Sequence, residues 1–307
     1  MKLIKQSFKF VNQKGFTLKD IYKHIEYCAR ISYKSQDKIT DTSYEKFVNM
    51  LESRGHDRPL EFGTVHLKMS DSDFNKIRSI LCINKIHNDQ WIKYHYVGDI
   101  TYITTNYRYY LNILKIFPKV EKFFTEEDNE YYPKRYTVHM ILDRGVMDEF
   151  RTHVGLSHLA ESTRYCNYSK DKFSNEVTFI EPCWLDMHDT DEGREVTRNW
   201  NFDILDGCAI IAEEGEFDDA RDAFLTSLNV AEHCYLELLQ KGWTPQQARS
   251  VLPLGIKSEL ISCGFEDAWV NFFYRRDAKD AHSMAHEIAK LLHKEFIKRG
   301  FINEKIK

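Results

Sequence analysis

The stretch that decides the fold is TVHMILDRGVMDEF, residues 137–150, where two hydrophobic periodicities meet. Residues 137–142 are rich in β-branched and apolar side chains, which predicts a β-strand. Beyond them Val146, Phe150 and Val154 repeat every four residues, which predicts the apolar face of a helix. A strand that runs directly into a helix indicates a mixed α/β domain.

Similar patterns on either side of this stretch extend the prediction. Strands are predicted at TVHLKM (64–69) and EVTFI (176–180), with DITYITT (99–105) as a further candidate, and together they indicate a small antiparallel sheet. The C-terminal third is expected to be helical. The predicted helices cover residues 21–33, 43–54, 73–84, a segment that begins at Asn106, 218–242 and about 281–299.

Cap residues predict where two of these helical segments begin. Thr42 and Glu45 have the spacing of a capping box, in which each side chain binds the other residue's backbone. Thr244 and Gln247 form a second box, so Arg249 is expected to project from a short rigid helix.

Length and composition place the chain among ordinary globular proteins. It has 307 residues, of which 42% are apolar and 29% charged, and its 13 Gly and 6 Pro exclude a collagen-like or disordered protein. No repeat or linker divides it, so we expect one domain over residues 1–307, with the acidic segment 186–199 as a solvated loop. The net charge of −4 gives no field that attracts nucleic acid or an anionic membrane, and neither partner is expected.

The cysteines and the N-terminal segment indicate the cellular compartment in which the protein is expected. Seven cysteines without a C-x-x-C pair favour reduced thiols over disulfides or a zinc site. The first ten residues interrupt their apolar positions with Lys and lack a signal-peptide core, and no run of 18 apolar residues occurs. We therefore expect a cytoplasmic protein.

One motif stands out as a candidate for chemistry, because common phosphate-loop, dinucleotide-binding and nucleophile-elbow motifs do not occur. It is ESTRYCNY (161–168), which follows a stretch that we expect to be helical. Its Ser162, Thr163 and Arg164 can offer two hydroxyls, backbone N–H groups and a guanidinium to one phosphate.

Further basic residues lie among apolar neighbours, where a guanidinium requires a partner. These are Arg249 in ARSVLP and the pair Arg275 and Arg276 in FFYRRD. A bound anion or an acidic side chain of the protein itself would satisfy each of them, and the sequence leaves both interpretations open.

Two histidines have the spacing of metal ligands. His282 and His286 lie four residues apart and share one face of the last predicted helix. However, Ser283 stands where a metalloprotease motif has Glu, and the sequence offers no third ligand. We therefore expect packing or surface histidines and no metal site.

Seven blocks, in the same order along nearly the whole chain, resemble the flavin-dependent thymidylate synthases, the ThyX family. A chance match to one block is easy, whereas seven collinear matches are not. The blocks are ARISY (29–33), RGHDRPLEFGT (54–64), TNYR (105–108), DRGVMDEF (143–150), ESTRYCNYSKDKF (161–173), ARSVLP (248–253) and NFFYRRDAKDAH (271–282).

The resemblance implies a mixed α/β fold assembled as a homotetramer, with FAD and dUMP bound where subunits meet. It also implies reductive methylation, in which the methylene group of methylenetetrahydrofolate passes to C5 of dUMP and FAD reduced by NADPH supplies hydride.

The family's substrate positions carry over residue by residue. Glu149 falls where the family often has a Gln beside the base, and Ser162 and Arg276 are the residues to which we assign the catalytic role. The other dUMP contacts fall on Thr163 and Arg164 at the phosphate and on Arg249 at the nucleotide.

Only some of the family's FAD-binding positions are retained in this sequence. The family's Arg-His-Arg signature falls on Thr152, His153 and Val154, so both guanidiniums are lost. Arg151 is one residue early and, on a helix, is expected to point about 100° away from position 152. Further departures are Phe62, Ala160 and Asp267, while the retained cofactor positions are Ser32, His56, Glu61, His153 and Asn271.

Two other functions stay open. One is a diverged paralogue that keeps the pyrimidine-nucleotide pocket and has altered chemistry, such as hydroxymethylation, or has lost the flavin reaction. The other is an unrelated metal-dependent hydrolase that uses His282 and His286. Each retained flavin-side residue also has a structural interpretation, as a helix-end hydroxyl, a loop residue or a surface group.

Overall fold

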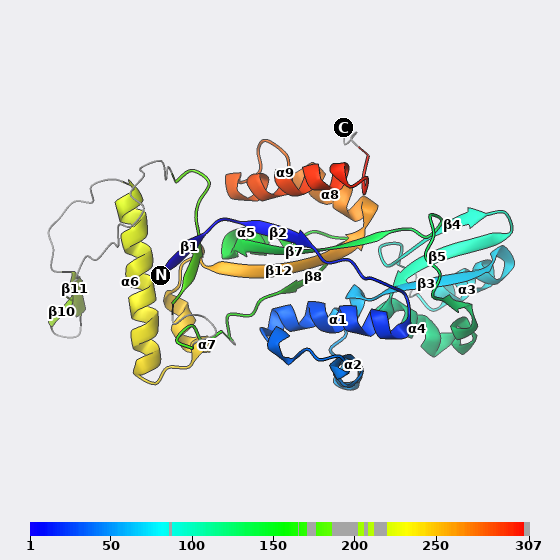
Figure 1. Ribbon diagram of the computed structural model, residues 1–307, viewed down its shortest axis with the longest axis horizontal. Coiled ribbons are helices and arrows are strands. Elements are labelled where there is room, and N and C mark those ends of the chain that lie inside the picture. The colour runs from blue at the N-terminus through cyan, green and yellow to red at the C-terminus, as the bar shows by residue number, and fades with distance from the viewer. Residues whose placement is uncertain are drawn as a thin grey trace.

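The computed structural model describes residues 1–85, 88–164, 166–170, 176–185, 202–205, 208–211 and 220–303. In this part of the chain, helices lie on both faces of a central sheet, and a second sheet lies towards one end (Figure 1). The predicted mixed α/β class with small antiparallel sheets is confirmed, but the strands predicted at 64–69, 137–142 and 176–180 lie in three different sheets rather than in one. The helices are α1 (Leu18–Tyr33), α2 (Ser43–Ser53), α3 (Asp71–Ile83), α4 (Tyr107–Ile116), α5 (Arg144–Phe150), α6 (Ala220–Gln240), α7 (Pro245–Ala248), α8 (Glu266–Arg276) and α9 (Ser283–Lys298).

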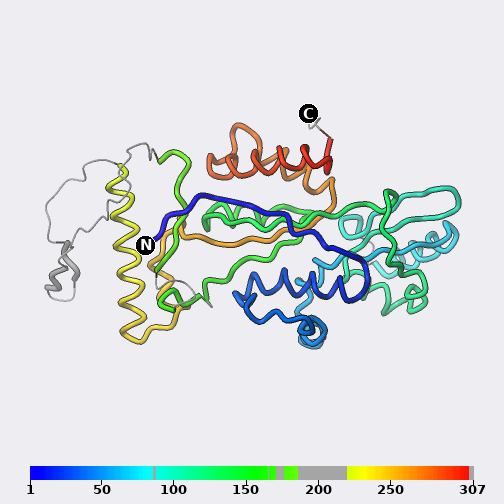
Figure 2. The backbone as a smooth tube through the Cα atoms, in the orientation of Figure 1, coloured from blue at the N-terminus to red at the C-terminus, as the bar shows by residue number. Residues whose placement is uncertain are grey.

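The central sheet is antiparallel throughout, and its longest pairing joins β7 to β12. Leu260 of β12 lies opposite Met140 of β7 on one side and Ala160 of β8 on the other. Figure 2 shows the N-terminal segment running along this sheet before the chain enters α1. The strand order is β2 (Ser7–Phe10), β7 (Arg135–Asp143), β12 (Lys257–Phe265) and β8 (Ser157–Ala160).

Alternation along β7 explains why helices cover both faces of this sheet. Val138, Met140 and Leu142 are fully buried in the core that α8 and α9 complete (Figure 1). Thr137, just before them, points to the opposite face in the period of two and faces α1, where its hydroxyl is 3.3 Å from the His24 ring. The strand that the sequence predicted at 137–142 is therefore the structural centre of the domain.

A second four-stranded sheet packs with α1 to α4 around a core of its own. Fully buried members of this core include Ile21, Val65, Phe74 and Ile113. Two short pairs complete the described strands, β1 (Lys2–Ile4) with β9 (Thr178–Ile180) and β10 (Phe202–Leu205) with β11 (Cys208–Ile211). The order of the second sheet is β4 (Ile92–Val97), β5 (Ile100–Asn106), β3 (Thr64–Ser70) and β6 (Phe124–Thr125).

One predicted capping box is wrong and the other is confirmed. The Thr42 side chain makes no cap hydrogen bond at the start of α2. Instead Ser43, one residue later, accepts from the Thr40 backbone N–H and donates to buried Glu26 of α1. At α7 the Thr244 N–H donates to Gln247 Oε1 at 2.9 Å, as the box requires.

The helix predicted to include Val154 is shorter than expected. α5 ends at Phe150, and Val154 lies beyond it with 67% of its surface exposed. Gly155 then takes a φ of +94°, and the chain continues as β8, which the sequence analysis had treated as helical. Pairing of β8 with β12 satisfies the backbone here, and this long-range contact overrides the local helical pattern.

Residues 220–303 are mainly helical, as predicted, but they also contain β12, which no local pattern predicted. Both faces of this strand are buried, and polar Ser258 and Ser262 lie among its apolar residues. Its sequence therefore shows neither a strict period of two nor a continuous apolar run. The expected loop at 186–199 lies outside the described residues. Among those that are described, no helix is both long and apolar enough to cross a membrane.

The core between α8, α9 and the central sheet gives a direct stability prediction. Phe296 is fully buried against Phe10, Trp269 and Phe273. Phe296→Ala should lower the free energy of unfolding by about 3–5 kcal/mol, because a cavity replaces the ring. Leu291→Ala on the same helix, where Leu291 is 49% exposed, should cost about 1 kcal/mol or less in the same urea denaturation experiment. Equal losses for the two variants would contradict this packing.

Candidate functional site

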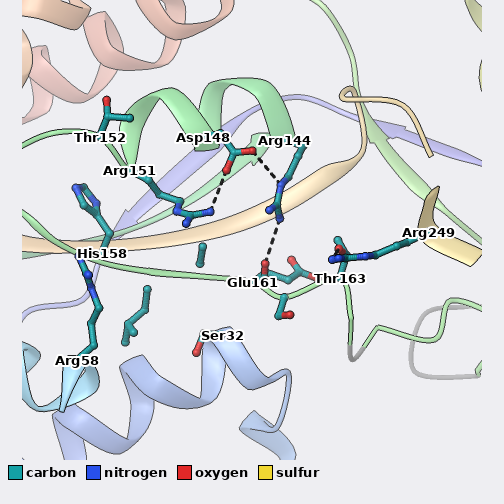
Figure 3. A pocket seen from close by; sticks show the side chains of 13 residues that line it. Ser32, Arg58, Arg144, Asp148, Arg151, Thr152, His158, Glu161, Thr163 and Arg249 are labelled. Carbon is teal, nitrogen blue, oxygen red and sulfur yellow. Dashed lines mark hydrogen bonds and ion pairs between the residues drawn. The ribbon is translucent and has the colours of Figure 1, made fainter. Parts of the chain in front are cut away.

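A cavity of about 570 Å³ lies between the C-terminal end of α1, helix α5 and the segment that follows β8 (Figure 3). It collects side chains from five separate parts of the chain, and its size is typical of small-molecule sites. The lining residues are Ser32, Arg58, Arg144, Asp148, Arg151, Thr152, His158, Leu159, Ala160, Glu161, Ser162, Thr163 and Arg249.

Positive charge dominates this cavity. Four guanidiniums line it against two carboxylates, and one of these, Asp148, is shared by Arg144 at 3.3 Å and Arg151 at 2.9 Å. The other carboxylate, Glu161, is neutralised by two lysines behind the cavity wall. The remaining excess of positive charge makes the cavity suited to an anionic ligand.

At one end of the cavity the Thr163 hydroxyl of the 161–164 motif meets Arg249. Thr163 is buried, and its Oγ1 accepts a hydrogen bond from Arg249 Nη1 at 2.9 Å. The Ser162 N–H reaches the Ser32 carbonyl at 3.4 Å, which ties the segment to the last turn of α1. Arg164 points elsewhere, is exposed and donates to Gln246 at 3.0 Å. Ser162, Thr163 and Arg249 thus line the same cavity, and Arg164 lies outside its lining.

A buried ionic network holds this end in place. Glu161 accepts from Lys34 and Lys257, each at 3.2 Å, and both lysines also pair with Glu259. His139 Nε2 is 2.9 Å from the second oxygen of Glu259. Burial alone would raise the pKa of Glu259, but the His139 hydrogen bond and the two lysines hold it well below its usual range. The network is electrically balanced, so its charges are compensated inside the protein.

Glu161 also fixes the segment that carries the motif. Its N–H donates to the Glu259 carbonyl at 2.7 Å, and its Oε2 accepts from the Glu259 N–H at 3.0 Å. Cys166, five residues after Glu161, donates its thiol to Glu161 Oε1 at 3.2 Å. One buried carboxylate therefore fixes both ends of the segment that carries Ser162 and Thr163.

A second cluster joins three residues that the resemblance placed at the substrate and the flavin. Arg276 donates through Nε to His153 at 2.7 Å, and through its two terminal nitrogens to the Glu149 carboxylate at 2.5 Å and carbonyl at 3.0 Å. Burial, and then the charges of Arg276 and Arg275, lower the pKa of His153 from 6.5 to about 4, so its ring is neutral and accepts the hydrogen bond. Thr152 donates to the same Glu149 carbonyl, which is where this cluster meets the cavity.

The other predicted cofactor positions are dispersed. Ser32 lines the cavity, while His56 and Asn271 are exposed outside it. Glu61 is buried and accepts from Arg108 and from Ser157, both at 2.6 Å. Of these four residues, the cavity gathers only Ser32.

The structure adds residues that the sequence analysis missed. Arg58, Arg144, Asp148 and His158 all line the cavity, and Arg58 and Arg144 lie inside two of the blocks already quoted, which was the available signal. Arg151, the C-cap residue of α5 with helical dihedral angles, and Thr152 both line this cavity.

The histidines of the last helix have partners within the protein. His286 Nδ1 and His293 Nδ1 lie 3.5 and 2.7 Å from Asp277, and His282 is exposed. In the described ranges, no group of three or more His, Cys, Asp or Glu side chains is arranged to hold a metal ion.

The ionic network predicts a large effect of Glu161 on stability. Glu161→Ala leaves Lys34 and Lys257 buried with only Glu259 as a carboxylate partner, and should lower the free energy of unfolding by about 3–5 kcal/mol. Glu295→Ala removes a partly exposed carboxylate that also contacts two cations, and should leave the unfolding curve almost unchanged. A Glu161 variant as stable as the Glu295 variant would show that the network is unimportant.

His158 predicts a pH dependence. Burial, mainly, lowers its pKa from 6.5 to about 4, so the unfolded chain takes up a proton between these values while the folded protein does not. Stability should therefore fall as the pH falls from 6.5 to 4. His158→Gln should remove on the order of 3 kcal/mol of that loss, measured as the difference between the two proteins across this range. The same pH slope in both proteins would contradict the neutral buried ring.

Comparisons with known proteins complete the description of the site. Residues 134–299 match the thymidylate synthase complementing protein family. A search of curated proteins found no match. Two solved structures of the UMP/dUMP methylase PolB from Streptomyces cacaoi, bound with 5-Br UMP and 5-Br dUMP, are 15% identical, with TM-scores of 0.41 and 0.39. The alignments cover 97% of this chain and 92% and 93% of those chains.

The family match spans more than half of the chain and contains β7, α5, the 161–164 motif, Arg249 and Arg276. The chain therefore belongs to the thymidylate synthase complementing protein family.

Proposed function

We propose that this protein binds dUMP in the cavity and transfers a one-carbon unit to C5 of its uracil. The observation that carries the proposal is the hydrogen bond between Arg249 and the Thr163 hydroxyl, beside Ser162, at one end of a cavity with excess positive charge. Family membership supplies the reaction class, and the site supplies an anion-binding end that a nucleotide monophosphate requires.

In this proposal Ser162, Thr163 and Arg249 hold the phosphate. Thr163 and Arg249 already share a hydrogen bond, so the guanidinium is oriented before ligand arrives. The Glu161 contacts keep the two hydroxyls at the cavity wall, and this preorganisation lowers the ordering cost of binding. Arg164 remains a predicted phosphate contact, although its guanidinium is engaged with Gln246.

The residues around the base have a separate role. Uracil C5 attacks as an enolate-like carbon, and a nearby guanidinium stabilises the negative charge that develops on the ring carbonyl. Arg144 lines the cavity and can take this position, while Arg276 reaches it only through Glu149 and Thr152. We therefore assign Arg276 to positioning Glu149 and Thr152 rather than to direct contact with the ring.

The finer reaction follows the family. The methylene carbon of methylenetetrahydrofolate bonds to C5, the C5 proton leaves, and a hydride completes the methyl group, giving dTMP and tetrahydrofolate. The chemistry that a bound FAD would supply is this hydride transfer, with NADPH as the source. The residues fit such a group in charge, because Arg58 and Arg151 line the cavity although positions 152 and 154 carry no guanidinium. A homotetramer in the cytoplasm remains the assembly and location that we predict.

One observation favours an altered reaction as the second candidate. Thr152 and Val154 replace two family arginines, and Val154 is exposed beyond the end of α5. A diverged enzyme that acts on a related pyrimidine nucleotide, for example by hydroxymethylation without hydride, would keep the phosphate end and lose the flavin. Product analysis by mass spectrometry distinguishes the two, since methylation and hydroxymethylation differ by one oxygen.

The phosphate assignment gives a test by calorimetry. Arg249→Gln should weaken dUMP binding by about 10- to 100-fold, because a charge-assisted hydrogen bond is lost. Deoxyuridine, which has no phosphate, should bind the wild-type and the variant equally. Arg54→Gln, an exposed arginine after α2 and outside the cavity, is the matched control and should bind dUMP normally. Unchanged dUMP affinity in the Arg249 variant would contradict the proposed site.

A further inference from the structure

The end of the cavity away from Thr163 and Arg249 contains a second group of cations. Figure 3 shows Arg58, Arg151 and His158 close together there. Arg58 is the first residue of a short 3-10 helix, Arg58–Phe62, and Arg151 directly follows α5. Two elements that are far apart in the sequence thus bring two guanidiniums to one place.

These cations are only partly compensated. Within the described ranges, no hydrogen bond or ion pair involves the Arg58 guanidinium, whereas the other arginines of the cavity each have a protein partner. Arg151 has Asp148, but that carboxylate also serves Arg144. Arg58, Arg144, Arg151 and Asp148 together therefore leave two positive charges unbalanced.

The imidazole ring of His158 adds no positive charge to this group. His158 is buried, with Nδ1 at 2.8 Å from the Ser262 hydroxyl and Nε2 at 3.3 Å from the His153 carbonyl. Burial is the main cause of its lowered pKa, and the charges of Arg58 and Arg151 both contribute, which places both guanidiniums near the same ring. His158 is thus a neutral residue beside the two arginines that line this end of the cavity.

We propose that Arg58 and Arg151 form a second anion subsite, which binds the phosphoryl oxygens of a second ligand beside the nucleotide. Two guanidiniums present paired N–H donors that match phosphoryl oxygens, and a diphosphate carries the two negative charges that this end lacks. In the proposed reaction that ligand is the dinucleotide cofactor, so this assignment of the ligand rests on the proposed function. The two arginines then supply the charge that Thr152 and Val154 do not.

The experiment separates this subsite from the nucleotide site. The full chain, with and without saturating dUMP, is titrated with FAD, with riboflavin, which has no phosphate, and with inorganic pyrophosphate. Flavin fluorescence reports the first two and calorimetry the third. Arg58→Gln and Arg151→Gln are compared with the wild-type and with Arg54→Gln, and matching circular dichroism spectra check that each variant is folded.

We expect each cavity variant to weaken FAD and pyrophosphate binding by about 10-fold or more, with riboflavin and dUMP unchanged. Arg54→Gln should bind all ligands as the wild-type does. If pyrophosphate binds the wild-type and binds both cavity variants more weakly, while FAD does not bind at all, the anion subsite is supported and its ligand is a free phosphoryl anion.

Two results would overturn the subsite. One is FAD and pyrophosphate affinity that is unchanged in both cavity variants, or absent in the wild-type. The other is riboflavin binding that weakens as much as FAD binding, since the arginines would then act without a phosphate. Failure of dUMP to bind the wild-type would instead count against the proposed function, because pyrophosphate binding is measured without dUMP.

Discussion

The pairing of Glu161 and Glu259 with Lys34 and Lys257 is the constraint on which the rest of the site depends. Four charges are withdrawn from water here, and each would be costly alone, but the balanced set is compensated internally. The four residues come from the end of α1, the end of β8 and the strand β12, so the network joins three elements at one point. The orientation of the candidate phosphate-binding segment follows from this junction.

The network also explains how the cavity keeps its charge. Because the lysines neutralise Glu161 from behind, its carboxylate does not cancel the arginines on the cavity side. Asp148 is then the remaining compensating anion of the lining, and it is shared by two guanidiniums. This positive charge at both ends of the cavity is the basis on which we propose that it binds a nucleotide and a second phosphorylated ligand.

Local patterns predicted those parts of the structure whose cause is local. The change of period after residue 142 correctly predicted β7 and α5, and the 161–164 motif contains the Thr163 hydroxyl that meets Arg249. β8 and β12 could not be predicted in this way, because their stability comes from pairing across about 100 residues of sequence. Arg58 and Arg144 were missed for the same reason, since only the folded chain brings them to one cavity.

The central claim is that one end of this cavity holds the phosphate of dUMP. A crystal structure of the protein with dUMP tests it most directly. The account predicts phosphate oxygens within about 3.2 Å of Arg249 and of the Ser162 and Thr163 hydroxyls, with the uracil directed towards Arg144. A phosphate bound between Arg58 and Arg151, or a nucleotide bound outside the cavity, would contradict it.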